Sequence, residues 1–223
     1  MFDLIKLILK FFKTYLIGNL REENLSLYFL NLITENTKNK KIKIIDFGSG
    51  YDPSVISNLQ NLLLSKNKSS EIKCYDFYTK NQIEELQIKF KDIEFFNLKN
   101  INKNEKVDFI IISDVLHHIG FENSDKIFNL LKDLSAISNF IIIKDHFEYS
   151  IFSRYLLRFM DFIGNYADGV SIPKKYLKKE ELKNIEKILK LNEVGKVDKI
   201  KLYKFFFFPF NRNKYQFIKI YKT

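Results

Sequence analysis

The sequence predicts an α/β fold in which a doubly wound, mostly parallel β-sheet is covered by helices on both faces. Two observations lead to this prediction. Short apolar runs of strand length alternate with segments of helical periodicity through the first two-thirds of the chain, and this alternation is typical of βαβ units. Near the end, two further apolar runs flank Pro209 to Lys214 and predict an antiparallel hairpin that closes the sheet.

The composition fits a globular domain with a sizeable core. The chain has 223 residues, of which 46% are apolar and 23 are Phe. The single cysteine, Cys74, excludes an internal disulfide and a cysteine-based zinc site, and it fits a reducing cytoplasm. The formal net charge is +10. Because most of the cations are scattered lysines, we interpret them as a solvated surface and expect no nucleic-acid partner.

Residues 1–40 are expected to form a helical cap ahead of the main domain, which would span 41–223. Residues 1–17 have the pattern of an amphipathic helix with three lysines on one face. We favour packing of this helix on the sheet or over the substrate crevice. The alternative is peripheral contact with the inner face of the membrane. We find no secretory signal and no uncharged apolar stretch of about 20 residues, and therefore expect a cytoplasmic protein.

The central motif joins the first predicted strand to the first helix. The strand Ile42 to Phe47 runs into the glycine turn Asp46 to Gly50, and Asp52 with Pro53 is expected to open the helix. Glycine permits the sharp turn because it tolerates φ > 0, and the following helix N-terminus brings backbone N–H groups to a ligand. The dinucleotide fingerprint G-x-G-x-x-G is incomplete here, because Pro53 stands in place of its third glycine.

The remaining elements are expected in alternating order. Strands are predicted at Ile72 to Phe77, Ile93 to Leu98, Val107 to Ser113 and Phe140 to Ile143, and hairpin strands at Val197 to Phe207 and Tyr215 to Tyr221. Helices are predicted at Asn81 to Phe90, Ser124 to Leu134, Tyr149 to Gly164 and Lys179 to Leu191. Residues 147–195 would form an insertion on the substrate side, whose aromatic helix could act as a lid.

Candidate site residues lie at the ends of the predicted strands, because open parallel sheets bind ligands beyond their carboxyl edge. Asp76 ends the second strand at a spacing where an acid can accept both hydroxyls of a ribose, and Phe77 follows it. Asn97 and Leu98 end the third strand, and Asp114 follows the fourth.

The three histidines of the chain also follow predicted strands. His117 and His118 come soon after Asp114, and His146 ends the string K-D-H after the fifth strand. Histidine titrates near neutral pH, so His118 and His146 are candidate general bases that Asp114 or Asp145 could orient. No metal site is expected, because the side chains of adjacent histidines diverge and no cysteine or third histidine lies nearby in sequence.

These motifs resemble those of the class I S-adenosylmethionine-dependent methyltransferases. Asp46 to Gly50 resembles motif I of that family, acid-x-G-x-G, and V-D-F-I-I-I-S-D-V-L-H-H-I resembles the fourth motif of its small-molecule and lipid enzymes. The strings K-D-H, R-F-M-D-x-x-G-N and G-V-x-x-P together resemble a bacterial subgroup. Asp52 departs from the pattern, since the family often has a third glycine at this position.

The resemblance implies a Rossmann-like sheet, S-adenosylmethionine as cofactor, and a small-molecule or lipid-like acceptor. The implied cofactor-binding residues are Asp46, Gly48, Ser49, Gly50, Asp52, Asp76, Phe77, Asn97, Leu98 and Asp114, and the catalytic candidates are His118, His146 and Asp114. Two alternatives stay open. One is a nicotinamide-dependent oxidoreductase, against which the missing glycine and the terminal hairpin count. The other is a non-catalytic nucleotide-fold protein that acts through partners.

Overall fold

The computed structural model describes residues 20–119, 124–165, 171–202 and 212–223. The strands are β1 (Lys41–Phe47), β2 (Ser69–Asp76), β3 (Glu94–Asn97), β4 (Val107–Ser113), β5 (Ser138–His146), β6 (Asn192–Lys196) and β7 (Gln216–Lys222). The helices are α2 (Ser54–Ser65), α3 (Lys80–Lys89), α4 (Leu116–Ile119), α5 (Ser124–Ser135), α6 (Ile151–Asn165) and α7 (Lys179–Leu189), together with a helix described over residues 20–36 and short 3₁₀ turns at Leu98–Asn100 and Arg212–Tyr215.

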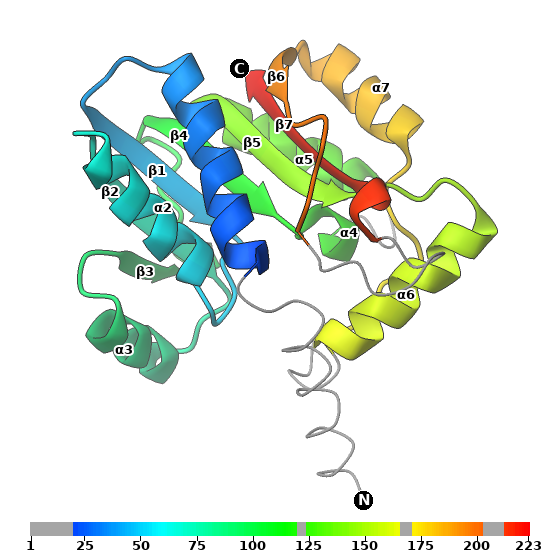
Figure 1. Ribbon diagram of the computed structural model, residues 1–223, viewed down its shortest axis with the longest axis horizontal. Helices are drawn as coiled ribbons and strands as arrows, with labels where there is room; N and C mark the ends of the chain where they lie inside the picture. The colour runs from blue at the N-terminus through cyan, green and yellow to red at the C-terminus, as the bar shows by residue number, and fades with distance from the viewer. Residues whose placement is uncertain (1–19, 120–123, 166–170, 203–211) are drawn as a thin grey trace, which may run out of the picture.

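The strands form one seven-stranded sheet in the order β3-β2-β1-β4-β5-β7-β6 (Figure 1). β1 to β5 run parallel, and β7 pairs antiparallel with both β5 and β6. This confirms the predicted doubly wound sheet with a C-terminal antiparallel hairpin. The strand order reverses between β1 and β4, and this switch point is where open α/β sheets bind their ligands.

Helices cover both faces of the sheet, so its central strands are buried on both sides. Successive side chains on a strand point to opposite faces. Ile44 accordingly joins a core with the helix over 20–36, α2 and α3, whereas Ile45 joins a second core with α5 and α7. This double burial explains why β1, β4 and β5 appear in the sequence as nearly continuous apolar runs.

The helix over residues 20–36 packs into the first of these cores. Leu25, Phe29 and Ile33 are fully buried there beside α2, and Figure 1 shows the two helices side by side over the sheet. The amphipathic helix predicted over 1–17 lies outside the described residues. No helix in the described ranges combines the length and the apolarity needed to cross a bilayer.

Two of the predicted elements need correction near the site. α2 begins at Ser54, with Pro53 at the N-cap position. Asp52 is therefore not the N-cap, although its Oδ1 accepts a hydrogen bond from the Ser54 N–H at 3.3 Å. β5 continues to His146, because pairing with β7 extends along its polar end as far as the register His146↔Gln216. Asp145 and His146 are thus strand residues and not part of a loop after it.

The first hairpin strand was predicted too late in the chain. β6 occupies Asn192–Lys196, immediately after α7, and residues 197–202 are not in a strand. Residues 203–207 of the predicted strand lie outside the described ranges. β6 lies at the edge of the sheet and is mostly exposed, so it lacks the apolar pattern on which the sequence prediction depends.

Candidate active site

The glycine turn after β1 has the backbone that the sequence predicts. Gly48 and Gly50 have φ values of +75° and +66°, which side chains rarely tolerate. A Cβ on Gly48 would also lie 2.4 Å from Cγ2 of Val115, whereas a Cβ on Gly50 would meet no atom of the described residues within 4 Å. Gly48 is therefore fixed by packing, while Gly50 presents its backbone to open space.

A small cavity of about 60 Å³ lies beside this turn. Its walls come from the turn itself, from the start of α2, from Ser113 at the end of β4, and from Arg21 and Phe29 of the N-terminal helix. Gly48, Ser49, Asp46 and Asp52 all line it. The structure therefore brings together the predicted residues around the turn and adds a cation, Arg21, from the helix that precedes β1.

Asp46 is a buried acid at the wall of this cavity. Its side chain is at the end of β1 and the residue is 5% exposed. Burial, with a smaller effect from nearby Asp76, raises the pKa of Asp46 to about 7, and Arg21 partly opposes this shift. Near neutral pH this carboxyl can thus gain or lose a proton when a charged group arrives.

Asp76 ends β2 directly opposite the glycine turn. Its Oδ2 accepts a hydrogen bond from the Gly50 N–H at 2.8 Å, and its Oδ1 accepts one from the Phe77 N–H at 2.6 Å. The Tyr78 hydroxyl holds the turn from the same side, because it donates to the Gly50 carbonyl at 2.5 Å and shares a 2.7 Å hydrogen bond with Ser49 Oγ. Each oxygen of Asp76 keeps a lone pair for a ligand hydroxyl.

The remaining predicted residues on this side lie at the end of β3 or beside Asp76. Phe77 is 70% exposed. Asn97 donates from Nδ2 to the Tyr78 carbonyl at 2.7 Å, and its Oδ1 accepts from the Lys99 N–H at 3.0 Å. Leu98 packs against the second core. In the structure, Asn97 thus connects two loops beside the site.

Asp114, just after β4, is surrounded by cations. It has a left-handed φ of +58°. Arg21 Nη2 lies 2.9 Å from Oδ2, the fully buried Lys144 contacts Oδ1, and His146 Nδ1 is 3.4 Å from Oδ1. Burial alone would raise the pKa of Asp114, but Lys144, His146 and Arg21 outweigh it and hold the pKa well below its ordinary value. These cations therefore favour the ionised form of Asp114.

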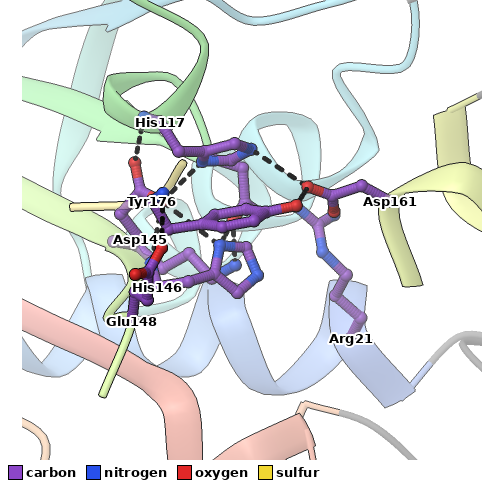
Figure 2. Close-up of polar contacts among 9 residues, drawn as sticks. Arg21, His117, Asp145, His146, Glu148, Asp161 and Tyr176 are labelled. Carbon is purple, nitrogen blue, oxygen red and sulfur yellow. Dashed lines mark hydrogen bonds and ion pairs between the residues drawn. The ribbon is translucent and has the colours of Figure 1, made fainter. Parts of the chain in front are cut away.

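His117 is the centre of a second buried network (Figure 2). Its Nδ1 lies 2.6 Å from Oδ1 of Asp145, and its backbone N–H donates to Oδ2 of the same residue at 3.2 Å. Its Nε2 lies 3.8 Å from Oδ2 of Asp161 on α6, and the Tyr176 hydroxyl donates to that oxygen at 2.5 Å. Burial would lower the pKa of His117, but Asp145, with help from Asp161, raises it above the ordinary value.

His117 lies next to both of the histidines that the sequence singles out as bases. Its ring centroid is 4.2 Å from that of His118 and 5.1 Å from that of His146. Burial and the neighbouring His117 lower the pKa of His118, which is half-buried. His146 is almost fully buried, with Nδ1 3.2 Å from Oδ1 of Asp145. The general-base role of either residue stays a prediction.

Asp114, His117, Asp145 and His146 have ligand atoms within 4.8 Å of one another, a spacing that could hold a metal ion. These groups already pair with one another, and Lys144 and Arg21 contact Asp114. The cations therefore compete with a metal for Asp114. That no metal binds here stays a prediction.

Three solved structures of similar fold are methyltransferases. The magnesium protoporphyrin IX methyltransferase ChlM from Synechocystis PCC 6803, solved with bound SAH, has a TM-score of 0.61 and 14% identity over 92% of this chain and 84% of that one. An O-methyltransferase family protein from Burkholderia thailandensis has a TM-score of 0.58 and 10% identity, and the match covers 92% of this chain and 57% of that one. A TehB-like SAM-dependent methyltransferase from Corynebacterium glutamicum has a TM-score of 0.51 and 12% identity, and the match covers 87% of this chain and 86% of that one.

This chain has the methyltransferase fold. It spans most of the Synechocystis and Corynebacterium proteins but little more than half of the Burkholderia protein. No protein-family model and no curated protein matches the sequence.

Within this methyltransferase fold, several site residues escaped the sequence analysis. Arg21, Tyr78, Asp161 and Tyr176 reach the turn or the histidines from distant segments, and His117 was not among the predicted bases. The only signals were the strings D-V-L-H-H and R-F-M-D, which contain His117 and Asp161. Neither string says that the two side chains meet, because that contact depends on how α6 packs.

Proposed function

We propose that this chain is an S-adenosylmethionine-dependent methyltransferase that acts on a small-molecule or lipid-like acceptor. The observation that carries the proposal is the pairing of the glycine turn with Asp76 at the switch point of the sheet. The hydrogen bond from Gly50 fixes the carboxylate beside the open side of the turn. This supplies a carboxylate for ribose hydroxyls next to bare backbone for the rest of the cofactor.

The residues around the turn carry charges and donors that suit the cofactor. Gly48 to Asp52 would hold its amino-acid end at the small cavity beside the turn. Arg21 lines that cavity and carries N–H donors suited to a carboxylate. Asp46, with its raised pKa, would ionise in response to the positive charge of the ligand. Asp76 and Phe77 would contact the ribose, with Asn97 and Leu98 toward the adenine.

When bound, S-adenosylmethionine supplies a methyl group on a cationic sulfonium. The protein then mainly has to align the acceptor and exclude water. We assign proton removal from the acceptor to His118, because its lowered pKa keeps the imidazole neutral and the side chain is half-exposed. His146 and the anionic Asp114 would contribute to the charge around the reacting atoms.

Transfer of a labelled methyl group tests the proposed function. The chain is incubated with methyl-labelled S-adenosylmethionine and with separate aqueous and organic extracts of cells that encode it. Label should enter a low-mass or lipid fraction, and Asp76→Ala should strongly reduce this incorporation at limiting S-adenosylmethionine, because the ribose loses its acceptor. The matched variant Asp92→Ala, at an exposed aspartate outside the site, should retain it. Label confined to nucleic acid or protein would contradict the proposed acceptor class.

The role of His118 has its own test once an acceptor is known. His118→Ala should lower turnover by roughly two to four orders of magnitude, while the affinity for S-adenosylhomocysteine stays unchanged. His146→Ala, assayed in parallel over several pH values, separates a base from a residue that only shapes the pocket. Near-wild-type turnover with an unshifted pH profile in both variants would leave alignment alone to account for the rate.

A further inference from the structure

Helix α6 is apolar on both of its faces. Leu156 and Leu157 point inward and pack with Tyr176 and Tyr215. On the opposite side, the outer face of α6 consists of Ile151, Phe152, Tyr155 and Phe159, which are 55% to 68% exposed. A surface helix normally presents polar side chains to water, and a continuous exposed apolar surface marks an interaction site.

A cationic hollow adjoins the start of this outer face. It has a volume of about 340 Å³, and Ile151 and Tyr149 form part of its wall. Three cations, Arg154, Lys178 and Lys179, line it together with two carboxylates, Glu148 and Glu180.

Arg154 forms two hydrogen bonds to Glu148, at 2.6 and 2.9 Å, which neutralises that carboxylate. Lys178 and Lys179 are exposed, as are Lys174 and Lys175 on the segment before them. Even with the exposed Glu180 and Glu181 counted against these four lysines, the surroundings of the outer face carry an excess of positive charge.

We propose that the outer face of α6 and the cationic hollow dock on an anionic phospholipid membrane. Phe and Tyr side chains favour the boundary between headgroups and acyl chains, and each nearby Lys or Arg is attracted to an anionic surface. A lipid phosphate would lie near Lys178 and Lys179. A second copy fits less well, because it would bring two positively charged surroundings together on a chain whose net charge is already +10.

The position of α6 in the fold suits this role. It follows the carboxyl end of β5, and Figure 1 shows it at one end of the molecule, away from the strand β3. The docking proposal does not depend on the proposed methyltransferase activity.

Vesicle flotation of the full-length chain tests the docking surface. Vesicles of phosphatidylcholine alone are compared with vesicles that contain phosphatidylglycerol as well, at low and high NaCl. The chain should float with the anionic vesicles, and high salt should reduce this binding because it screens the lysines. Failure of the wild-type chain to bind anionic vesicles at low salt would overturn the proposal.

Paired variants locate the binding surface. Phe152→Ser combined with Phe159→Ser should lower vesicle partitioning by about tenfold or more, because two aromatic side chains no longer leave water. The control pair Leu64→Ser and Ile88→Ser, at residues 56% and 75% exposed on α2 and α3, should leave partitioning unchanged.

Charge reversal gives an independent comparison. Lys178→Glu with Lys179→Glu should weaken binding to anionic vesicles, whereas Lys66→Glu with Lys91→Glu, at exposed residues elsewhere, should weaken it less. If the α6 double variant and the charge variant at the hollow both bind like the wild type, another segment such as residues 1–19 carries the binding and the proposal is wrong. A dimer that the α6 double variant dissociates, without vesicle binding, would also overturn it.

Discussion

Buried charge gathers where β4 and β5 end, and each charged residue there depends on a partner. Asp114 is neutralised by Lys144 and Arg21, and Asp145 by His117. An isolated buried carboxylate costs several kcal/mol, so these residues stabilise the fold only as a set. The two adjacent histidines consequently differ: Asp145 raises the pKa of His117, whereas burial and the neighbouring His117 lower the pKa of His118, the proposed base.

Asp46 should make the stability of the protein depend on pH. Its pKa rises from 3.8 to about 7 on folding, so the folded state holds this proton more tightly than the unfolded state. The resulting stabilisation is fully present below about pH 4 and is lost as the pH rises through 7. Asp46→Asn removes this dependence. Between about pH 4 and pH 8, the free energy of unfolding of the wild type should therefore fall relative to that of Asp46→Asn by an amount on the order of a few kcal/mol.

Urea denaturation at several pH values between 4 and 8.5 measures this effect. The exposed variant Asp92→Asn serves as the control and should follow the wild-type curve. If wild type and Asp46→Asn keep a constant difference in unfolding free energy over the whole range, Asp46 does not carry a raised pKa in the folded state.

At the scale of elements, the glycine turn after β1 is held between β2 and Val115, the residue before α4. Gly48 donates its N–H to the Tyr75 carbonyl at 2.8 Å on β2, and its α-carbon lies against Val115. The turn therefore has two constraints, one from its backbone dihedral angles and one from packing across the switch point. Gly50 carries only the first of these.

Gly48→Ala should reduce the free energy of unfolding by about 2–4 kcal/mol, from strain at positive φ and from overpacking against Val115. Gly50→Ala, which meets no such neighbour, should cost only about 1–2 kcal/mol. Adding Val115→Ala should recover part of the loss in Gly48→Ala and none of the loss in Gly50→Ala. Equal effects of Val115→Ala in the two backgrounds, measured by urea denaturation, would refute the packing explanation.

The sequence alone predicts those parts of the fold that depend on neighbouring residues in the chain. The apolar runs of β1 and β4 and the motif from Asp46 to Gly50 predicted the sheet and the turn, because burial on both faces and positive φ leave direct marks in the residues. The polar edge strand β6 leaves no such mark and was misplaced. The networks of Arg21 with Asp114 and of His117 with Asp145 join residues 93 and 28 positions apart, so they emerge only from packing.

At the scale of the whole molecule, the two cores hold the site at the reversal of strand order. The helix over 20–36 belongs to the first core and carries Arg21 to Asp114, while α6 carries Asp161 to His117 on the other side. The helix over 20–36, which precedes β1, thus completes the proposed cofactor site, and α6, which follows β5, completes the histidine cluster where the acceptor is proposed to bind. The cofactor side supports the central claim, because its turn, its acid and its cavity all meet there.

Calorimetric titration with S-adenosylhomocysteine, with NAD as the competing candidate, tests that claim most directly. The wild-type chain should bind S-adenosylhomocysteine and not NAD. Asp76→Ala should weaken that binding by about ten- to a hundredfold, as expected for hydrogen bonds to a charged group, and Asp92→Ala should bind like the wild type. Binding of NAD without binding of S-adenosylhomocysteine would contradict the methyltransferase assignment, and binding of neither would favour a non-catalytic nucleotide-fold protein.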